Sequence, residues 1–340
     1  MNRRQLFSAA SSVTAGLVFT LVILVICARS HFAAAGDFFA GAFTSVYYAG
    51  AVLNTAALLA AAALGDAVVL SSGELNLGGE GQIYAGGFTA AAVFAATDTL
   101  PPALSLAASF AAAVSVPALM ALISAVLRQF KHASVLLTSF LVSAAVIPFI
   151  DGLIAGRFRG SGGNLLATPF IREQVRFGHI MPPSPFSVPA AFVPLLCISA
   201  WYFMNRTVRG TQIKIEGISP EFAHYCGYPQ TRIIYGSLAV SGALHGLSGF
   251  LAVAGTYYTC HSGFYSGMGW NALSCALIAG SDPLALIPSS LILSWIFTAA
   301  GRTALNNNFG FDIGSLIQGV MLFCIAFQYA GGKRNGRHDI

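Results

Sequence analysis

Apolar runs about as long as a bilayer is thick recur along this chain, and they constrain its fold more than any other feature. Residues 49–70, 103–127 and 233–254 are three such runs. A helix of about 20 apolar residues crosses the hydrocarbon layer, and its backbone groups must pair within the helix. Only 9% of the residues are charged, against about a quarter in soluble proteins. The chain is therefore predicted to be an all-α, polytopic membrane protein.

The apolar runs divide the chain into about ten predicted transmembrane helices within one domain, residues 1–340. A cleavable signal peptide is the rival interpretation of the first run, but its length favours a retained helix. The predicted spans are, in order, residues 6–28, 49–70, 83–96, 103–127, 134–155, 187–204, 233–254, 271–280, 284–300 and 313–329.

The basic residues predict how these spans are oriented. If both termini are cytoplasmic, 11 of the 17 Lys and Arg residues lie on the cytoplasmic side, as the positive-inside bias requires. Residues 157–186 then form a long outer loop, and residues 205–232 form a long cytoplasmic loop.

Several functional classes lack support in the sequence. The six cysteines and seven histidines show no ligand spacing, so no metal site is predicted. The chain has no GxxxxGK[ST] motif to bind ATP by that route, and no clustered nucleophile and base that would suggest an enzyme. The cytoplasmic loops account for the net charge of +5, so no nucleic-acid partner is needed. Asp66 and Asp151 fall near predicted span ends, where we expect them to be solvated.

A polar, glycine-rich stretch at residues 71–82 interrupts the apolar pattern. It is either a loop between two helices or a broken segment inside the membrane that lines a transport path. Residues 263–271 form a second such break on the opposite side of the membrane. The two breaks suggest an inverted repeat, although glycine is common in membrane helices in any case.

Polar and aromatic side chains in the two breaks are the candidate substrate-pathway residues. Amide and carboxylate groups can bind ribose hydroxyls or heterocycle edges, and an aromatic side chain can stack on a ring. Glu80 has an alternative structural role, in which it binds the free amides at a helix start. The candidates are Asn76, Glu80, Gln82, Trp270 and Asn271.

The cytoplasmic loop contains a short helix signature with an apolar face. Its residues supply an N-cap, a proline at the first helical position, an acidic first turn, two aromatic side chains on one face and a terminating glycine. Such a helix could lie on the membrane surface or insert into a groove on a partner. These residues are Ser219, Pro220, Glu221, Phe222, Tyr225 and Gly227.

Three blocks of sequence together resemble one family. Residues 76–82 are similar to an N-I-G-x-E-G-Q signature, with Gly79 in place of an apolar residue. Residues 217–228 with 241–249, and residues 269–280, resemble two further blocks, with departures at Ser219, Phe222 and His245. The blocks resemble permease subunits of bacterial ABC importers for branched-chain amino acids, simple sugars and nucleosides. The nucleoside- and riboflavin-type members are the most similar.

This resemblance implies a place in a larger assembly. It implies a second permease subunit, identical or paralogous, two ATPase subunits or domains, and a substrate-binding lipoprotein, in the bacterial cytoplasmic (inner) membrane. ATP would be bound by the partner, so the permease itself needs no cofactor. The helix at residues 219–227 would be the coupling helix that contacts the ATPase.

The resemblance also implies a function, for which two alternatives stay open. We expect uptake of a nucleoside or a related heterocycle–polyol compound such as riboflavin. A simple-sugar ABC permease is the alternative within the same class. A stand-alone secondary transporter or channel is the alternative from another class, although few acidic residues lie in the apolar spans to relay ions.

Overall fold

The computed structural model describes residues 38–161 and 165–306, with isolated positions at 11, 14, 18, 19, 22, 36, 316, 319, 320 and 323. The predicted first and tenth spans and the basic tail after residue 330 lie outside the two continuous ranges. Within those ranges the chain is helical, with two isolated β-bridges and no strand. The helices are α3 (Val46–Ser71), α4 (Gly79–Ala96), α5 (Pro102–Lys131), α6 (Val135–Ala155), α7 (Val193–Arg206), α8 (Val208–Ile218), α9 (Pro220–Tyr225), α10 (Gln230–Ala252), α11 (Met268–Ile278) and α12 (Leu286–Asn306).

The all-α, polytopic prediction is confirmed. Four of the described helices are long and apolar enough to cross a membrane: α3, α5, α6, and α10 with its π-helical extension Val253–Tyr257. α11 is a shorter apolar helix, as the length of the predicted eighth span required. The total of ten spans stays a prediction, because two of them lie outside the described ranges.

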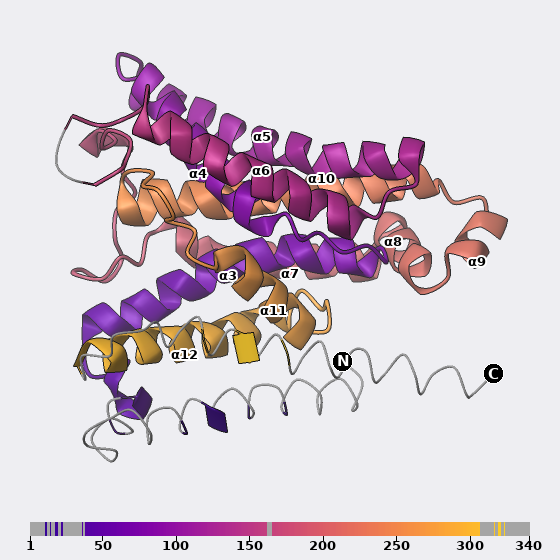
Figure 1. The fold of residues 1–340 in the computed structure, drawn as a ribbon. Coiled ribbons are helices and arrows are strands. Elements are labelled where there is room, and N and C mark those ends of the chain that lie inside the picture. Colours follow the sequence, from indigo (N-terminus) through magenta and orange to yellow (C-terminus); the bar gives the residue numbers. More distant parts are fainter. Residues whose placement is uncertain are drawn as a thin grey trace.

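α3 is the centre of the bundle, with other helices packed around it (Figure 1). The most apolar window of α3 is 89% buried, whereas those of α5 and α6 are 33% and 28% buried. α5 and α6 therefore form the periphery and present apolar side chains such as Leu119, Leu137 and Phe149 outward. An apolar exterior is the surface that a helix needs when lipid surrounds it.

The small residues of α10 allow the closest contacts in the bundle. A Cβ at Gly242 would lie 2.3 Å from the carbonyl oxygen of Pro117, and one at Gly246 would lie 2.0 Å from that of Ala113. On a neighbouring face, a Cβ at Gly249 would lie 2.2 Å from the carbonyl oxygen of Ile83. At these glycines the backbone of α10 contacts α5 and α4 with no side chain between them. Small residues commonly join membrane helices in this way.

Several elements differ from the sequence prediction. The predicted third span begins at Gly79, four positions before residue 83, and the predicted outer loop at residues 302–311 is helical through Asn306. The predicted sixth span is shorter, because a 3₁₀ turn, Pro189–Phe192, precedes α7. The predicted cytoplasmic loop contains a second helix, α8, whose two glycines and mixed charge conceal it in the sequence.

The predicted outer loop, residues 157–186, is packed onto the segment that follows α10. The backbone N–H groups of Thr168 and Ile171 donate to the carbonyls of Cys260 (2.9 Å) and Tyr258 (2.8 Å). The Tyr258 hydroxyl lies 2.7 Å from His179 Nε2. These contacts fix the approach of the chain to α11.

We expect Gly246→Ala to lower the free energy of unfolding by about 1–3 kcal/mol, because its Cβ has no room against α5. Thermal unfolding of the purified protein in detergent measures the change. Gly236→Ala is the matched control on the same helix, since a Cβ there meets nothing within 4 Å; its helix propensity should leave stability equal or higher. Equal losses in the two variants would contradict the close contact.

Junction of two broken helices

The two glycine-rich breaks meet inside the bundle. Any residue other than glycine at position 269 would place its Cβ 2.4 Å from the backbone nitrogen of Glu80. A Cβ at Gly79 would lie 3.2 Å from the Cα of Gly269. α4 runs from this point to the end where α5 begins. α11 runs to the opposite end. The helix that follows it, α12, returns across the bundle and places Arg302 beside Gly41, close to the start of α3. Two half-helices thus begin together and diverge, the geometry that an inverted repeat requires.

Between α3 and α4 the chain leaves helical geometry. Gly73, with φ +83°, turns it after α3, and residues 74–78 form no helix. Side chains pair the freed backbone groups: Leu77 N–H donates to Ser139 Oγ (2.9 Å), and Gly81 N–H donates to Ser143 Oγ (2.8 Å). Unpaired N–H groups in an apolar bundle would each cost several kcal/mol. The break is therefore a built element within the bundle, and the alternative of a plain surface loop is wrong.

Glu80 joins the two half-helices. It lies in the first turn of α4, and its Oε1 accepts hydrogen bonds from the backbone N–H groups of Gly269 (2.9 Å) and Trp270 (3.2 Å) at the start of α11. The first N–H groups of a helix have no partner within it and carry a partial positive charge. A carboxylate is the side chain that best satisfies them, so Glu80 has a structural role. Its other oxygen, Oε2, is buried without a hydrogen-bond partner in the described part of the chain.

Asn76 and Gln82 bind each other across the break. Asn76 Nδ2 donates to Gln82 Oε1 (3.0 Å) and to Ser241 Oγ on α10 (2.9 Å). Asn76 Oδ1 accepts the N–H of Gly78 (2.9 Å). Both amides are 2% exposed, and their bonds hold the non-helical segment against α10.

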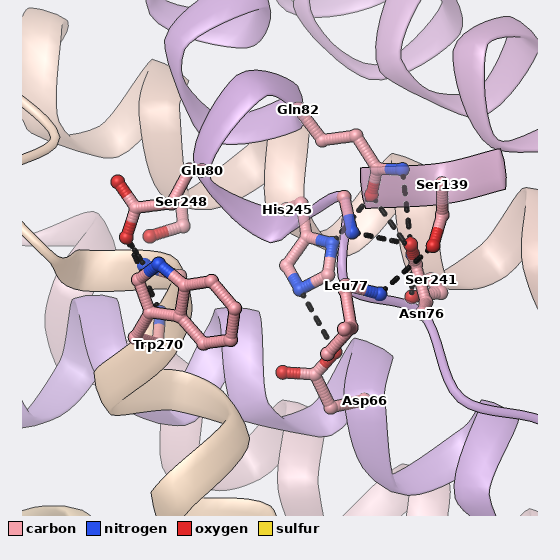
Figure 2. Close-up of polar contacts among 12 residues, drawn as sticks. Asp66, Asn76, Leu77, Glu80, Gln82, Ser139, Ser241, His245, Ser248 and Trp270 are labelled. Atoms are coloured by element: carbon pink, nitrogen blue, oxygen red, sulfur yellow. Dashed lines mark hydrogen bonds and ion pairs between the residues drawn. The ribbon is translucent and has the colours of Figure 1, made fainter. Parts of the chain in front are cut away.

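His245 extends this network to a buried acid. Its Nδ1 lies 2.7 Å from Gln82 Oε1, and its Nε2 lies 3.3 Å from Asp66 Oδ1 on α3. Figure 2 shows His245 between the Asn76–Gln82 pair on one side and Glu80 with Trp270 on the other. Asp66 is 2% exposed, so the expectation that it is solvated is wrong. The sequence signal for this pair is weak, a single histidine among the small residues of α10.

The five predicted pathway residues therefore separate into two groups. Asn76, Glu80 and Gln82 are buried and bonded to other parts of the junction. Trp270 and Asn271 are half-buried at the start of α11, with the Trp270 ring 6.5 Å from that of Phe140 on α6. Trp270 and Asn271 retain surface that a ligand could reach, and of the other three residues Glu80 binds the start of their helix. Their contact with a substrate stays a prediction.

The predicted short helix is present as α9. Ser219 Oγ accepts the N–H of Phe222 (3.4 Å), Pro220 is the first helical residue, and Gly227 ends the turn with φ +72°. The aromatic side chains project outward: Phe222 is 55% exposed and Tyr225 is 88% exposed. Two exposed aromatic side chains on a capped helix are suited to a groove on a partner or to a membrane surface, and which of the two they contact stays a prediction.

α9 is held firmly on the bundle. The Gln230 side chain donates to the carbonyl of Pro220 (2.7 Å) and to Glu216 Oε1 on α8 (3.2 Å). α8, α9 and the start of α10 are thus tied together, so a force on α9 is transmitted to α10. Within the described residues, no three His, Cys, Asp or Glu side chains gather as metal ligands would.

Comparison with known families places the chain among membrane permeases. The family described as "Branched-chain amino acid transport system / permease component" matches residues 48–326. This match spans both half-helices, the junction and the α8–α9 segment.

Three curated proteins are similar over most of their length. The "Probable riboflavin import permease protein RfuC" of Treponema pallidum (strain Nichols) is 32% identical over 329 residues, 96% of this chain and 87% of that protein. The guanosine ABC transporter permease protein NupP of Bacillus subtilis (strain 168) is 20% identical, over 94% of this chain and 92% of that protein. The nucleoside ABC transporter permease protein NupB of Lactococcus lactis subsp. cremoris (strain MG1363) is 24% identical, over 86% and 83% respectively.

We expect Glu80→Ala to lower the free energy of unfolding by about 2 kcal/mol or more, because two N–H groups at the start of α11 lose a charged acceptor. Glu80→Gln retains one acceptor oxygen and should lose less. Thermal unfolding without any ligand measures both variants. If Glu80→Ala unfolds like the unmodified protein, the carboxylate does not hold the junction.

Removing one member of the Asp66–His245 pair should cost about 1–3 kcal/mol, because a buried polar atom of the other member loses its partner. We expect the double variant Asp66→Ala/His245→Ala to lose less stability than the sum of the two single variants. A double-mutant cycle on thermal unfolding gives the coupling energy. Strict additivity would mean that the pair does not interact.

Proposed function

The chain belongs to the family of branched-chain amino acid transport system permease components, and we propose that it is the membrane subunit of an ATP-driven importer for a compound that joins a heterocycle to a polyol or sugar. Riboflavin is the first candidate and nucleosides are the second. The observation that carries the substrate class is the start of α11, where a half-buried indole adjoins an amide side chain. The similarity to a riboflavin import permease over 96% of this chain supports the order of the two candidates.

The substrate would pass along the junction of the half-helices. Trp270 offers a ring face for stacking on the heterocycle, and Asn271, which is also half-buried, places an amide beside it. Hydroxyl groups of a polyol or ribose can hydrogen-bond to an amide. Asn76, Glu80 and Gln82 would keep the start of α11 in place and add polar groups to the path.

The remaining parts of the importer would be separate chains. ATP would be bound and hydrolysed by two ATPase subunits or domains, of which each permease subunit contacts one through α9. A second permease subunit, a copy or a paralogue, would complete the path, and a substrate-binding lipoprotein would deliver the compound. The assembly would lie in the bacterial cytoplasmic (inner) membrane.

Uptake by cells tests this function. A host without its own riboflavin uptake would express the permease together with its ATPase and binding protein, and labelled riboflavin would be counted. Competition by excess riboflavin, but not by nucleosides or glucose, is expected. Saturable uptake of labelled nucleoside but not of labelled riboflavin would favour the second candidate, and saturable uptake of labelled glucose alone would favour a sugar permease. Uptake that survives an inactive ATPase but collapses with the ion gradient would overturn the ABC mechanism.

Trp270→Ala should lower uptake by about fivefold to tenfold, since it removes the stacking surface, while Trp270→Phe should retain most of it. Uptake rates normalised to the amount of permease in the membrane measure the effect. Trp201→Ala on α7, which is also half-buried, is the control and should transport normally. Unchanged uptake by Trp270→Ala would remove the indole from the path.

Uptake should be abolished, while the permease still reaches the membrane, by Phe222→Asp, by Tyr225→Asp or by deletion of residues 220–227. The reason is that α9 would no longer fit an apolar groove on the ATPase. Val208→Asp is the matched control: Val208 is 75% exposed and lies at the far end of α8. Immunoblots of membranes and labelled-substrate uptake measure the two properties separately. Normal uptake with Phe222→Asp would contradict the docking role.

A further inference from the structure

A groove separate from the junction opens between α7 and α10. It has a volume of about 660 Å³, within the roughly 300–1,000 Å³ typical of small-molecule sites. α3 forms its floor through Leu64 and Val68, and none of the candidate pathway residues lines it. The groove therefore requires its own explanation.

The walls of the groove are apolar along most of their length. α7 contributes residues such as Phe203 and Met204, and α10 contributes Val240 and Leu244. The outer face of α7 beside it is also apolar, with Leu195 61% exposed and Ile198 47% exposed. The groove is thus continuous with the surface that faces lipid.

One end of the groove is positive. Arg209 and Arg232 both line it, and neither has a hydrogen bond or ion pair within the described ranges. Arg209 lies in the first turn of α8 and Arg232 in the first turn of α10, and neither first turn contains an acidic residue. A cation at a helix start is unfavourable because the helix dipole is positive there. Two guanidinium groups and two helix starts therefore converge on one cavity without any acidic side chain in its lining.

A buried polar group also faces the groove. Ser237, one of its lining residues, is 2% exposed, and its hydroxyl has no hydrogen-bond partner in the described part of the chain. Such a group costs free energy until a ligand supplies a partner. An ester carbonyl near the headgroup of a lipid is a suitable acceptor for this hydroxyl.

We propose that this groove binds an anionic phospholipid, with the phosphate headgroup between Arg209 and Arg232 and one acyl chain along α7 and α10. The charge selects an anionic headgroup, and the apolar walls select a hydrocarbon chain. Basic pockets between membrane helices bind anionic lipid headgroups by the same physical chemistry. Because α8 carries Arg209 and is tied to α9, the bound lipid also stabilises the end of the molecule where α9 projects.

Native mass spectrometry of the full-length permease in detergent tests the site, with dioleoyl phosphatidylglycerol and dioleoyl phosphatidylcholine as probes. The unmodified protein should bind one phosphatidylglycerol about tenfold more tightly than phosphatidylcholine. Arg209→Gln/Arg232→Gln should remove this preference. Arg206→Gln/Lys131→Gln changes the same charge outside the groove and should keep it.

A second pair of variants tests the acyl-chain groove. Gly236→Leu fills the groove where a Cβ meets nothing within 4 Å, and it should weaken binding of both lipids. Gly152→Leu, at an equally open helical position on α6, is the control and should bind as the unmodified protein does. Thermal unfolding confirms that each variant is folded.

Four outcomes would overturn the proposal. They are equal binding of the two lipids by the unmodified protein, an unchanged preference in Arg209→Gln/Arg232→Gln, and displacement of the lipid by excess riboflavin or nucleoside. The fourth is no lipid binding above the level of Gly236→Leu, which would mean that another protein segment fills the groove.

Discussion

The backbone of residues 74–78 leaves helical geometry inside an apolar bundle, and the rest of the junction depends on how its polar groups are paired. Asn76, Ser139 and Ser143 supply acceptors for N–H groups that lipid could not satisfy. Glu80 does the same for the start of α11. Most polar side chains at the junction are thus buried and bonded to one another, and of the five predicted pathway residues Trp270 and Asn271 alone are half-buried.

Close helix contact makes this arrangement compact. Gly246 on α10 lies against the backbone of both α5 and α4. A Cβ at Gly246 would lie 2.0 Å from the carbonyl oxygen of Ala113 on α5, and a Cβ at Gly86 on α4 would lie 2.6 Å from the Cα of Gly246. His245, the neighbouring residue, consequently lies at the level of Gln82 and Asp66. The small residues therefore bring helices together and also bring buried polar groups within hydrogen-bond distance, which ties the packing of the bundle to the geometry of its junction.

The sequence predicted the features that depend on local chemistry. Apolar length predicted α3, α5, α6 and α10, and the residues from Ser219 to Gly227 predicted α9 with its cap. It did not predict that Asp66 lies beside His245, because that contact joins residues 179 positions apart and depends on helix packing. It also missed α8, whose stability comes from its contacts with α7, α9 and α10 more than from its own composition.

The shared carboxylate of Glu80 limits how this subunit can move. Both half-helices begin within hydrogen-bond distance of one side chain, so a hinge that opened between them would break two charged hydrogen bonds at once. A conformational cycle that preserves these bonds carries α4 and α11 as one rigid body. Any change in access would then arise at the outer surfaces of the bundle, while the junction moves as one unit.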